Sequence, residues 1–194
     1  GEWVLRTACR LNKQWQDEGL ARVPIAVNLS GHQFREERLE GLVEEILEET
    51  GLAPEYLELE ITESIMMTER LEAAKALERL RSKGIRVALD DFGTGFSSLG
   101  YVKDFPLDAI KIDRFFIRDI QFGGDAAAIV KAIVGMAHSL GIRVVAEGVE
   151  ERAQVESAAA FGCDELQGYF FSRPIPESEF PALLVLRGNV STLP

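Results

Sequence analysis

The sequence predicts an α/β protein built as a TIM-like (β/α)8 barrel, truncated at the N-terminus to about six strand-helix units. Strands and helices alternate along all 194 residues, which is typical of a largely parallel sheet with helices outside it. About six strands can be recognised, whereas a closed barrel has eight strands and about 250 residues. Polar residues also recur where the strands end, as they do at the mouth of such barrels.

The helices are predicted from apolar residues that recur with helical spacing. The first helix has one apolar face, made of Val4, Leu5, Ala8, Leu11 and Trp15. Gly51, Gly84 and Gly141 each follow such a segment and fit helix C-caps. The predicted helices are 3–18, 39–50, 69–83, 126–140, 151–161 and 177–186.

Short apolar segments between the helices predict the strands. They cover residues 24–28, 57–62, 85–89, 107–112, 142–146 and 164–167. An open doubly wound sheet is the alternative fold. It is weakened because the sequence has no glycine-rich G-x-G-x-x-G first turn. We therefore favour the barrel, and we expect residues 1–194 to be one N-terminally incomplete domain.

Composition narrows the classes of partner and compartment. The net charge of −11 disfavours binding to polymeric nucleic acid, which usually needs a basic surface. Cys9 and Cys163 form neither a metal-type cluster nor a disulfide framework, and reduced thiols are typical of the cytoplasm. We expect a cytoplasmic domain. Because the sequence does not begin with Met, we also expect a fragment of a longer chain.

Five predicted strands end in a polar residue that would point into the barrel. Residues two apart along a strand share a face, and these five follow an inward residue by two positions. They are Asn28, Glu60, Asp90, Lys111 and Glu147. One such residue alone is usually solvated or part of a turn. The same register at five consecutive strands indicates an active site at the C-terminal face.

The chemistry of this set, to which Asp91 is added, favours a divalent metal site. Carboxylate and amide oxygens suit Mg²⁺ or Mn²⁺, and packed carboxylates repel one another unless cations neutralise them. Lys111 would supply part of that charge and could hold an attacking water. Paired metals support in-line phosphoryl displacement, so metal-assisted hydrolysis of a phosphate ester is predicted. An enolase-type proton abstraction uses similar groups and stays open.

Seven short motifs occur in a fixed order along the chain. They are Val27-Asn-Leu-Ser30, Glu58-Leu-Glu-Ile-Thr-Glu-Ser64, Asp90-Asp-Phe-Gly-Thr-Gly95, Lys111-Ile-Asp113, Glu147-Gly-Val-Glu150, Gln167-Gly-Tyr-Phe170 and Pro174. In this order they resemble the EAL family of cyclic di-GMP phosphodiesterases, from Trp3 to about Leu184. The resemblance implies a barrel of the EAL type and hydrolysis of cyclic di-GMP to linear pGpG in bacterial second-messenger signalling.

The resemblance also implies a role for each matching residue. The implied ligands of two Mg²⁺ or Mn²⁺ ions are Asn28, Glu60, Asp90, Asp91 and Glu147. The implied catalytic residues are Lys111, which orients or activates the water, Glu147 and Gln167. The implied substrate-binding residues are Ser30, Glu150, Gln167 and Pro174. The implied regulatory loop comprises Phe92, Gly93, Thr94 and Gly95, anchored by Glu63.

The partners implied by the resemblance are cyclic di-GMP, a second copy of the chain and an upstream GGDEF or sensory domain. The homodimer would form through the loop after Asp91 and neighbouring helices. The name-giving Glu-Ala-Leu segment, which supplies a further metal ligand, is absent from the sequence. We expect it upstream, so that the parent is an enzyme and this fragment alone is inactive. A non-catalytic cyclic di-GMP receptor and a dimerisation module are the alternatives.

Overall fold

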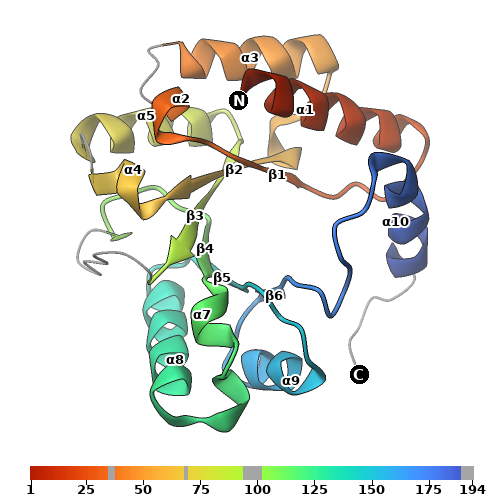
Figure 1. Ribbon diagram of the computed structural model, residues 1–194. Helices are drawn as coiled ribbons and strands as arrows, with labels where there is room; N and C mark the ends of the chain where they lie inside the picture. Colours follow the sequence, from red (N-terminus) through yellow and green to blue (C-terminus); the bar gives the residue numbers. More distant parts are fainter. Residues whose placement is uncertain (35–37, 68–69, 94–101, 189–194) are drawn as a thin grey trace.

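One sheet of six parallel strands forms the centre of the protein. The computed structural model describes residues 1–34, 38–67, 70–93 and 102–188. Within them the strand order is β1-β2-β3-β4-β5-β6, and Figure 1 shows the sheet curled with helices outside it. The strands are β1 (Ile25–Asn28), β2 (Leu57–Thr62), β3 (Arg86–Phe92), β4 (Ala109–Ile112), β5 (Arg143–Ala146) and β6 (Glu165–Leu166). This sequential order confirms the truncated barrel and excludes the doubly wound alternative, whose strand order reverses.

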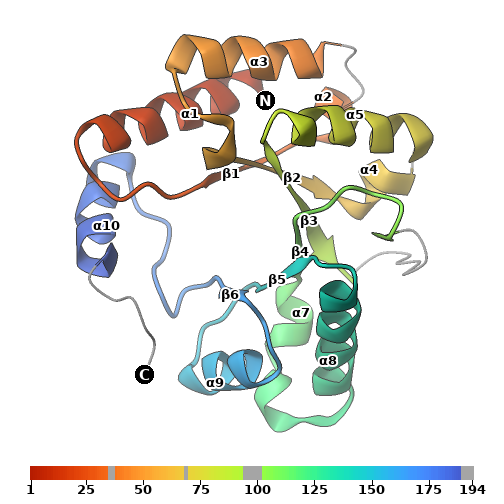
Figure 2. The same cartoon turned by 180° about the vertical axis from the view of Figure 1, so that it is seen from behind.

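The longer helices of the described residues lie around the outside of the curled sheet, as Figures 1 and 2 show. They are α1 (Glu2–Asp17), α3 (Leu39–Thr50), α5 (Arg70–Ser82), α8 (Gly124–Ser139), α9 (Arg152–Ala160) and α10 (Phe180–Gly188). Among them, α10 lies on the open side of the sheet beside α1. All six were predicted, with ends that differ by a few residues. The last differs most, because its predicted first turn is the separate 3-10 turn η3 (Glu177–Glu179).

Three one-turn helices were not predicted. They are α2 (Gly31–Phe34), α4 (Glu63–Met67) and α7 (Arg114–Ile117). Each begins within three residues of the end of a strand, so together they border the C-terminal face of the sheet. The 3-10 turns η1 (Pro54–Tyr56) and η2 (Ile120–Phe122) add two further short segments.

The two faces of the sheet are packed differently. The outward side chains of β2 are fully buried under the helices: Leu57, Leu59 and Ile61. The inward face instead carries a small apolar cluster, formed by Ala88, Ala109 and Val145. These small side chains occupy the middle of the inward face. The inward positions at the C-terminal ends of the strands are occupied by polar residues instead.

The first and last helices pack against each other. The ring centroids of Trp15 in α1 and Phe180 in α10 lie 4.6 Å apart, and both views show α10 beside α1. The sheet itself has edges at β1 and β6. Ala26 and Asn28, on the inward face of β1, are therefore exposed.

No single helix in the described part of the chain is long and apolar enough to cross a membrane. Arg114–Phe122 and Gly124–Ser139 meet the length and composition criterion only as a pair, which is bent by 119°. The second of these segments is α8, whose apolar face packs in the core through Val130 and Ala137.

Candidate active site

Lys111 lies among the C-terminal ends of the strands, where its ammonium forms ion pairs with three carboxylates from other segments. Its Nζ is 2.5 Å from Oε1 of Glu60, 2.7 Å from Oε1 of Glu147 and 3.2 Å from Oδ1 of Asp90. The lysine is only 4% exposed. The structure therefore brings together the inward residues of β2, β3 and β4 with Glu147, which directly follows β5.

Asn28, at the end of β1, connects the first strand to this group. Its Nδ2 donates a hydrogen bond of 2.9 Å to Oε2 of Glu60, while Lys111 binds the other oxygen of the same carboxylate. Glu60 is 5% exposed. A buried carboxylate that accepts hydrogen bonds on both oxygens has a fixed orientation, and Glu60 is held in this way.

A β-bulge in β3 directs two adjacent aspartates to the site. Leu89 pairs with Ile110 and Phe92 pairs with Ile112, so both Asp90 and Asp91 lie opposite a single residue of β4. Such an insertion bends the strand and redirects its side chains. Asp91 adopts a φ of +55°, which is uncommon for a residue with a side chain.

The bulge completes a carboxylate cluster that simple alternation along the strand does not produce. Ligand oxygens of Asp90, Asp91 and Glu147 lie within 4.8 Å of one another. Alternation would have placed one of the two aspartates on the outer face. The only sequence signal for this arrangement is the consecutive Asp-Asp pair at the end of a strand.

The electrostatics of the cluster favour a bound cation. Burial raises the pKa of the Glu147 carboxyl against the opposing effect of Lys111. Burial and the neighbouring Asp90 raise the pKa of Asp91. Burial disfavours the charged form of Lys111, but its hydrogen bonds to Glu147 and Glu60 prevail and raise its pKa. One lysine thus leaves the set with an excess of negative charge.

The acidic residues fit a hard divalent cation. Oδ1 of Asp90 is buried without a hydrogen bond of good geometry among the described residues, although it lies 3.2 Å from Nζ of Lys111. A buried oxygen of this kind needs a compensating partner. Carboxylate and amide oxygens are what Mg²⁺ and Mn²⁺ prefer.

Glu63 contacts the backbone that follows the bulge. Its Oε1 accepts a hydrogen bond of 3.0 Å from the N–H of Gly93. Phe92 differs from the expectation, because it is the last residue of β3 and is 2% exposed in the core rather than part of a loop. Thr94 and Gly95 lie outside the described residues.

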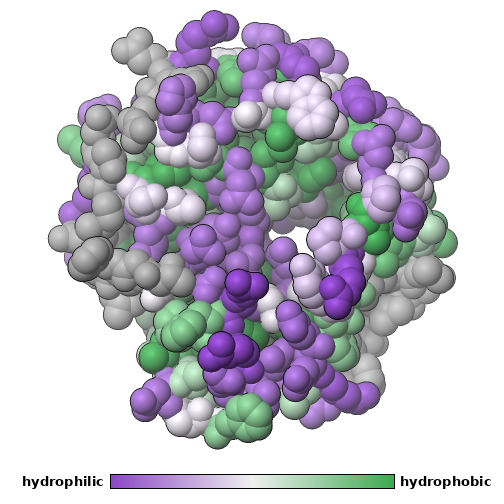
Figure 3. Space-filling view, viewed as in Figure 1, coloured by the Kyte–Doolittle hydropathy of each residue, from purple (hydrophilic) through white to green (hydrophobic). Residues whose placement is uncertain are grey.

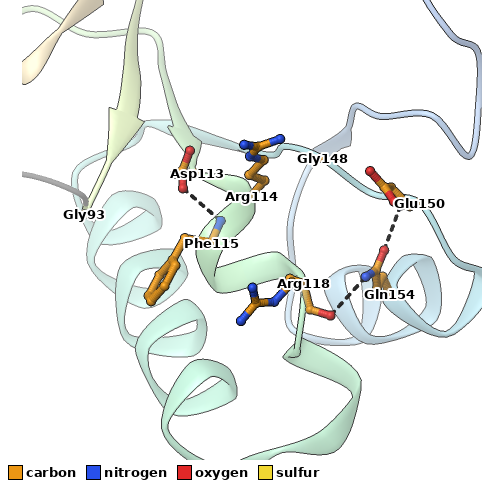
Figure 4. Close-up of a pocket in the computed structure, with 8 residues that line it drawn as sticks. All are labelled: Gly93, Asp113, Arg114, Phe115, Arg118, Gly148, Glu150 and Gln154. Atoms are coloured by element: carbon orange, nitrogen blue, oxygen red, sulfur yellow. Dashed lines mark hydrogen bonds between the residues drawn. The ribbon is translucent and has the colours of Figure 1, made fainter.

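A pocket of about 670 Å³ lies between α7 and the segment after β5. Figure 4 shows Arg114 and Glu150 on opposite sides of it. Gln154 fixes the wall: its Oε1 accepts from the N–H of Glu150 at 2.7 Å, and its Nε2 donates to the carbonyl of Arg118 at 3.1 Å. Gln154 was not predicted, since it lies within a helix, and only the pattern of a capping box at Glu151 and Gln154 marks it.

The other predicted substrate residues lie elsewhere around the strand ends. Gln167 and Pro174 line a second pocket of about 720 Å³ beside β6. The backbone of Gln167 is fixed by its N–H, which donates to the carbonyl of Ala146 at 2.8 Å. Ser30 follows β1 and donates from Oγ to Oε1 of Gln33 at 2.8 Å. The structure therefore does not gather these residues into one pocket.

The surface around the strand ends matches this arrangement. Figure 3 shows hydrophilic residues over the middle of the face seen in Figure 1, with apolar residues over α7 and α8. Fold and site together define a barrel protein with a partly buried acidic site of the kind that holds divalent metals. The EAL domain family model matches residues 1–174, and the chain belongs to the EAL domain family.

Known relatives support this membership. The chain is 44% identical over 182 residues to the bifunctional diguanylate cyclase/cyclic di-GMP phosphodiesterase MucR of Pseudomonas aeruginosa, covering 94% of this chain and 27% of that protein. The solved c-di-GMP complex of the MucR phosphodiesterase has a TM-score of 0.88 at 44% identity, covering 93% and 73%. The manganese/cy-diGMP complex of Klebsiella pneumoniae BlrP1 has a TM-score of 0.80 at 34% identity, covering 89% and 43%. The chain spans about a quarter of the length of the curated relatives it matches.

Proposed function

We propose that this chain is part of a metal-dependent phosphodiesterase that hydrolyses cyclic di-GMP to linear pGpG in bacterial signalling. The observation that carries the proposal is the convergence of Glu60, Asp90 and Glu147 on Lys111 at the strand ends. The named phosphodiesterase activity of the relative MucR, together with its c-di-GMP complex, supports the choice of substrate. The proposal replaces the enolase-type alternative, which has no such support.

Two Mg²⁺ or Mn²⁺ ions are the cofactors of this proposal. The residues that would hold them are Asn28, Glu60, Asp90, Asp91 and Glu147. When bound, such ions lower the pKa of a water and stabilise charge on the phosphate oxygens. Manganese in the c-di-GMP complex of BlrP1 supports an ion of this type.

Lys111 acts as a proton-bearing group rather than a base. Its raised pKa keeps the ammonium charged at neutral pH, so Nζ can donate a hydrogen bond to the attacking water or to a phosphate oxygen. Glu60 and Glu147 fix its direction through bonds of 2.5 and 2.7 Å. The oxygen of the water then bonds to the phosphorus, the P–O bond to one ribose breaks, and one proton of the water ends on that ribose oxygen, which leaves a hydroxyl on one ribose and the phosphate on the other.

Four residues around the strand ends are proposed to contact the nucleotide. Glu150 lines one pocket, and Gln167 and Pro174 line another. Ser30 follows Asn28 of the ligand set by two positions. The assignment rests on their motifs, and the two pockets would provide separate room for the two guanine ends of the molecule.

Regulation and partners follow the family pattern in this proposal. A homodimer would form through the loop after Asp91 and the neighbouring helices, with Glu63 and Gly93 connecting that loop to the site. We also propose an upstream GGDEF or sensory domain and a cytoplasmic location. The name of MucR, which combines diguanylate cyclase with phosphodiesterase, supports the upstream domain.

We propose that the 194 residues alone bind the nucleotide and do not turn it over. The sequence contains no Glu-Ala-Leu segment, so one ligand of the family set is not among its residues. The exposed inward face of β1, with Ala26 and Asn28, supports an incomplete site.

The test is product analysis with the protein expressed from its complete reading frame. With Mn²⁺ and cyclic di-GMP, chromatography is expected to show conversion to pGpG, and EDTA is expected to stop it. The 194-residue chain is expected to show binding without product. Bound but unaltered nucleotide with the complete protein would overturn hydrolysis in favour of the receptor alternative.

A further inference from the structure

Gly93 is held from two sides directly after the bulge that carries Asp90 and Asp91. On one side, Oε1 of Glu63 accepts a hydrogen bond from its N–H at 3.0 Å. On the other side lies the ring of Phe116 in α7. A Cβ built on Gly93 would be 2.6 Å from Cε2 of that ring, which is closer than a real Cβ can approach.

The backbone between the bulge and Gly93 needs such support. Asp91 has a φ of +55° and Gly93 a φ of +98°. A residue with a side chain in the left-handed region is strained and persists only where its surroundings determine its conformation. Gly93 is two residues from Asp91, so contacts that fix Gly93 also limit the positions open to the Asp91 carboxylate.

Phe116 is itself fixed well enough to act as one of these contacts. It packs against the hydrophobic core, and its ring meets Phe115 edge-on with centroids 5.3 Å apart. α7 is held at its start by Asp113, whose Oδ1 accepts from the N–H of Phe115 at 2.8 Å. Gln154 holds the segment's far end through its bond to the carbonyl of Arg118.

We propose that Phe116 is a positioning residue of the metal site. Its ring and the Glu63 carboxylate hold Gly93 between them, and Gly93 in turn holds the bulge in the conformation that places Asp90 and Asp91 beside Glu147. The inference rests on the metal site of the proposed function and goes beyond it. It makes the metal affinity of the site depend on an apolar side chain that is not itself a ligand.

The test is Mn²⁺ binding to the 194-residue chain, measured by electron paramagnetic resonance of free Mn²⁺. Phe116→Ala is expected to weaken binding about 10-fold to 100-fold, the range found when groups supporting metal ligands are removed. Phe116→Leu retains apolar bulk beside Gly93 and is expected to recover most of the loss. Phe122→Ala removes an exposed phenylalanine of η2 and is the matched control, with unchanged binding.

A second readout separates positioning from general destabilisation. In Phe116→Ala, hydrogen exchange of the Gly93 amide is expected to accelerate while the amide of Leu59 in β2 keeps its protection, and in Phe116→Leu the Gly93 amide is expected to regain most of its protection. Unchanged Mn²⁺ affinity in both variants would overturn the inference, as would a loss of Leu59 protection that accounts for the weaker binding. If the unsubstituted chain binds no Mn²⁺, the proposed metal site fails first and the inference fails with it.

Discussion

Lys111 is the residue on which the charge balance of the site depends. Its ammonium lies within 3.2 Å of carboxylate oxygens from Glu60, Asp90 and Glu147, and all of these groups are at least largely removed from water. Removing one partner of a buried ion pair leaves the other charge uncompensated. The lysine therefore stabilises the fold as well as serving the proposed chemistry.

Lys111→Met should lower the free energy of unfolding in EDTA by about 3 kcal/mol, because breaking a buried ion pair typically costs that much. Urea denaturation followed by circular dichroism measures it. Lys75→Met is the control, since Lys75 forms an exposed pair with Glu72 and should cost below about 0.5 kcal/mol. Equal stability of the two variants would contradict the role of Lys111.

Mn²⁺ affinity should fall as the pH is lowered. The fall should begin at a pH above the range in which ordinary carboxyl groups titrate. The pKa values of Asp91 and Glu147 are raised, so these groups retain protons at higher pH, and a cation has to displace those protons. Titration of the chain with Mn²⁺ at a series of pH values from 8 to about 5 tests this. An affinity that stays constant over the series would show that neither group holds the ion.

Part of the site could be predicted residue by residue, and part could not. Asn28, Glu60, Asp90 and Lys111 follow from alternation along strands, which is a local property of sequence. The inward turn of Asp91 depends on a register shift against β4, which no single strand encodes. The contact of Phe116 with Gly93 joins segments that are 23 positions apart, and it has no local signal.

At the scale of elements, the segment after β6 is fixed by one close approach. A Cβ built on Gly168 would lie 2.1 Å from the carbonyl oxygen of Val149. That contact holds the segment of Gln167 and Gly168 against the segment after β5. The N–H of Val149 also donates a hydrogen bond of 3.0 Å to the carbonyl of Gln167. Two predicted functional segments are thereby joined through their backbones.

Gly168→Ala should destabilise the protein by about 3 kcal/mol, at the upper end of what overpacking costs, because the neighbouring atoms are backbone. Gly135→Ala is the matched control within α8, where a Cβ meets nothing within 4 Å. It should stabilise by up to about 1 kcal/mol through helix propensity. Thermal unfolding of both variants tests the contrast, and equal effects would exclude the close approach as the cause.

Long elements were predictable and one-turn helices were not. The apolar spacing of α1 and α3 spans several turns, so their periodicity stands out. α2, α4 and α7 have four or five residues each, which is too few for a period of 3.6 residues to be visible. Their positions depend on the sheet end that they cover.

The whole molecule is a curled sheet with two edges rather than a closed ring of strands. Each of β1 and β6 pairs with one neighbour in the described part of the chain. Contacts across the interior maintain the curl: Arg143 in β5 donates from Nη2 to Oε2 of Glu58 in β2 at 3.3 Å. Trp15 and Phe180 connect the ends of the helix layer.

The 194-residue chain should associate as its concentration rises, since unpaired strand edges invite pairing with another chain. Light scattering coupled to size-exclusion chromatography over a range of loading concentrations measures the mass. A longer chain that supplies the missing barrel strands should associate less through these edges. A single monomeric mass for the short chain at every concentration would contradict this prediction.

Anomalous scattering from crystals grown with Mn²⁺ and cyclic di-GMP would locate the divalent-metal site proposed at the strand ends. Manganese peaks are expected in contact with the carboxylates of Asp90, Asp91 and Glu147, with the nucleotide phosphate beside them. Manganese absent from these carboxylates, with the nucleotide bound elsewhere, would contradict the proposed site.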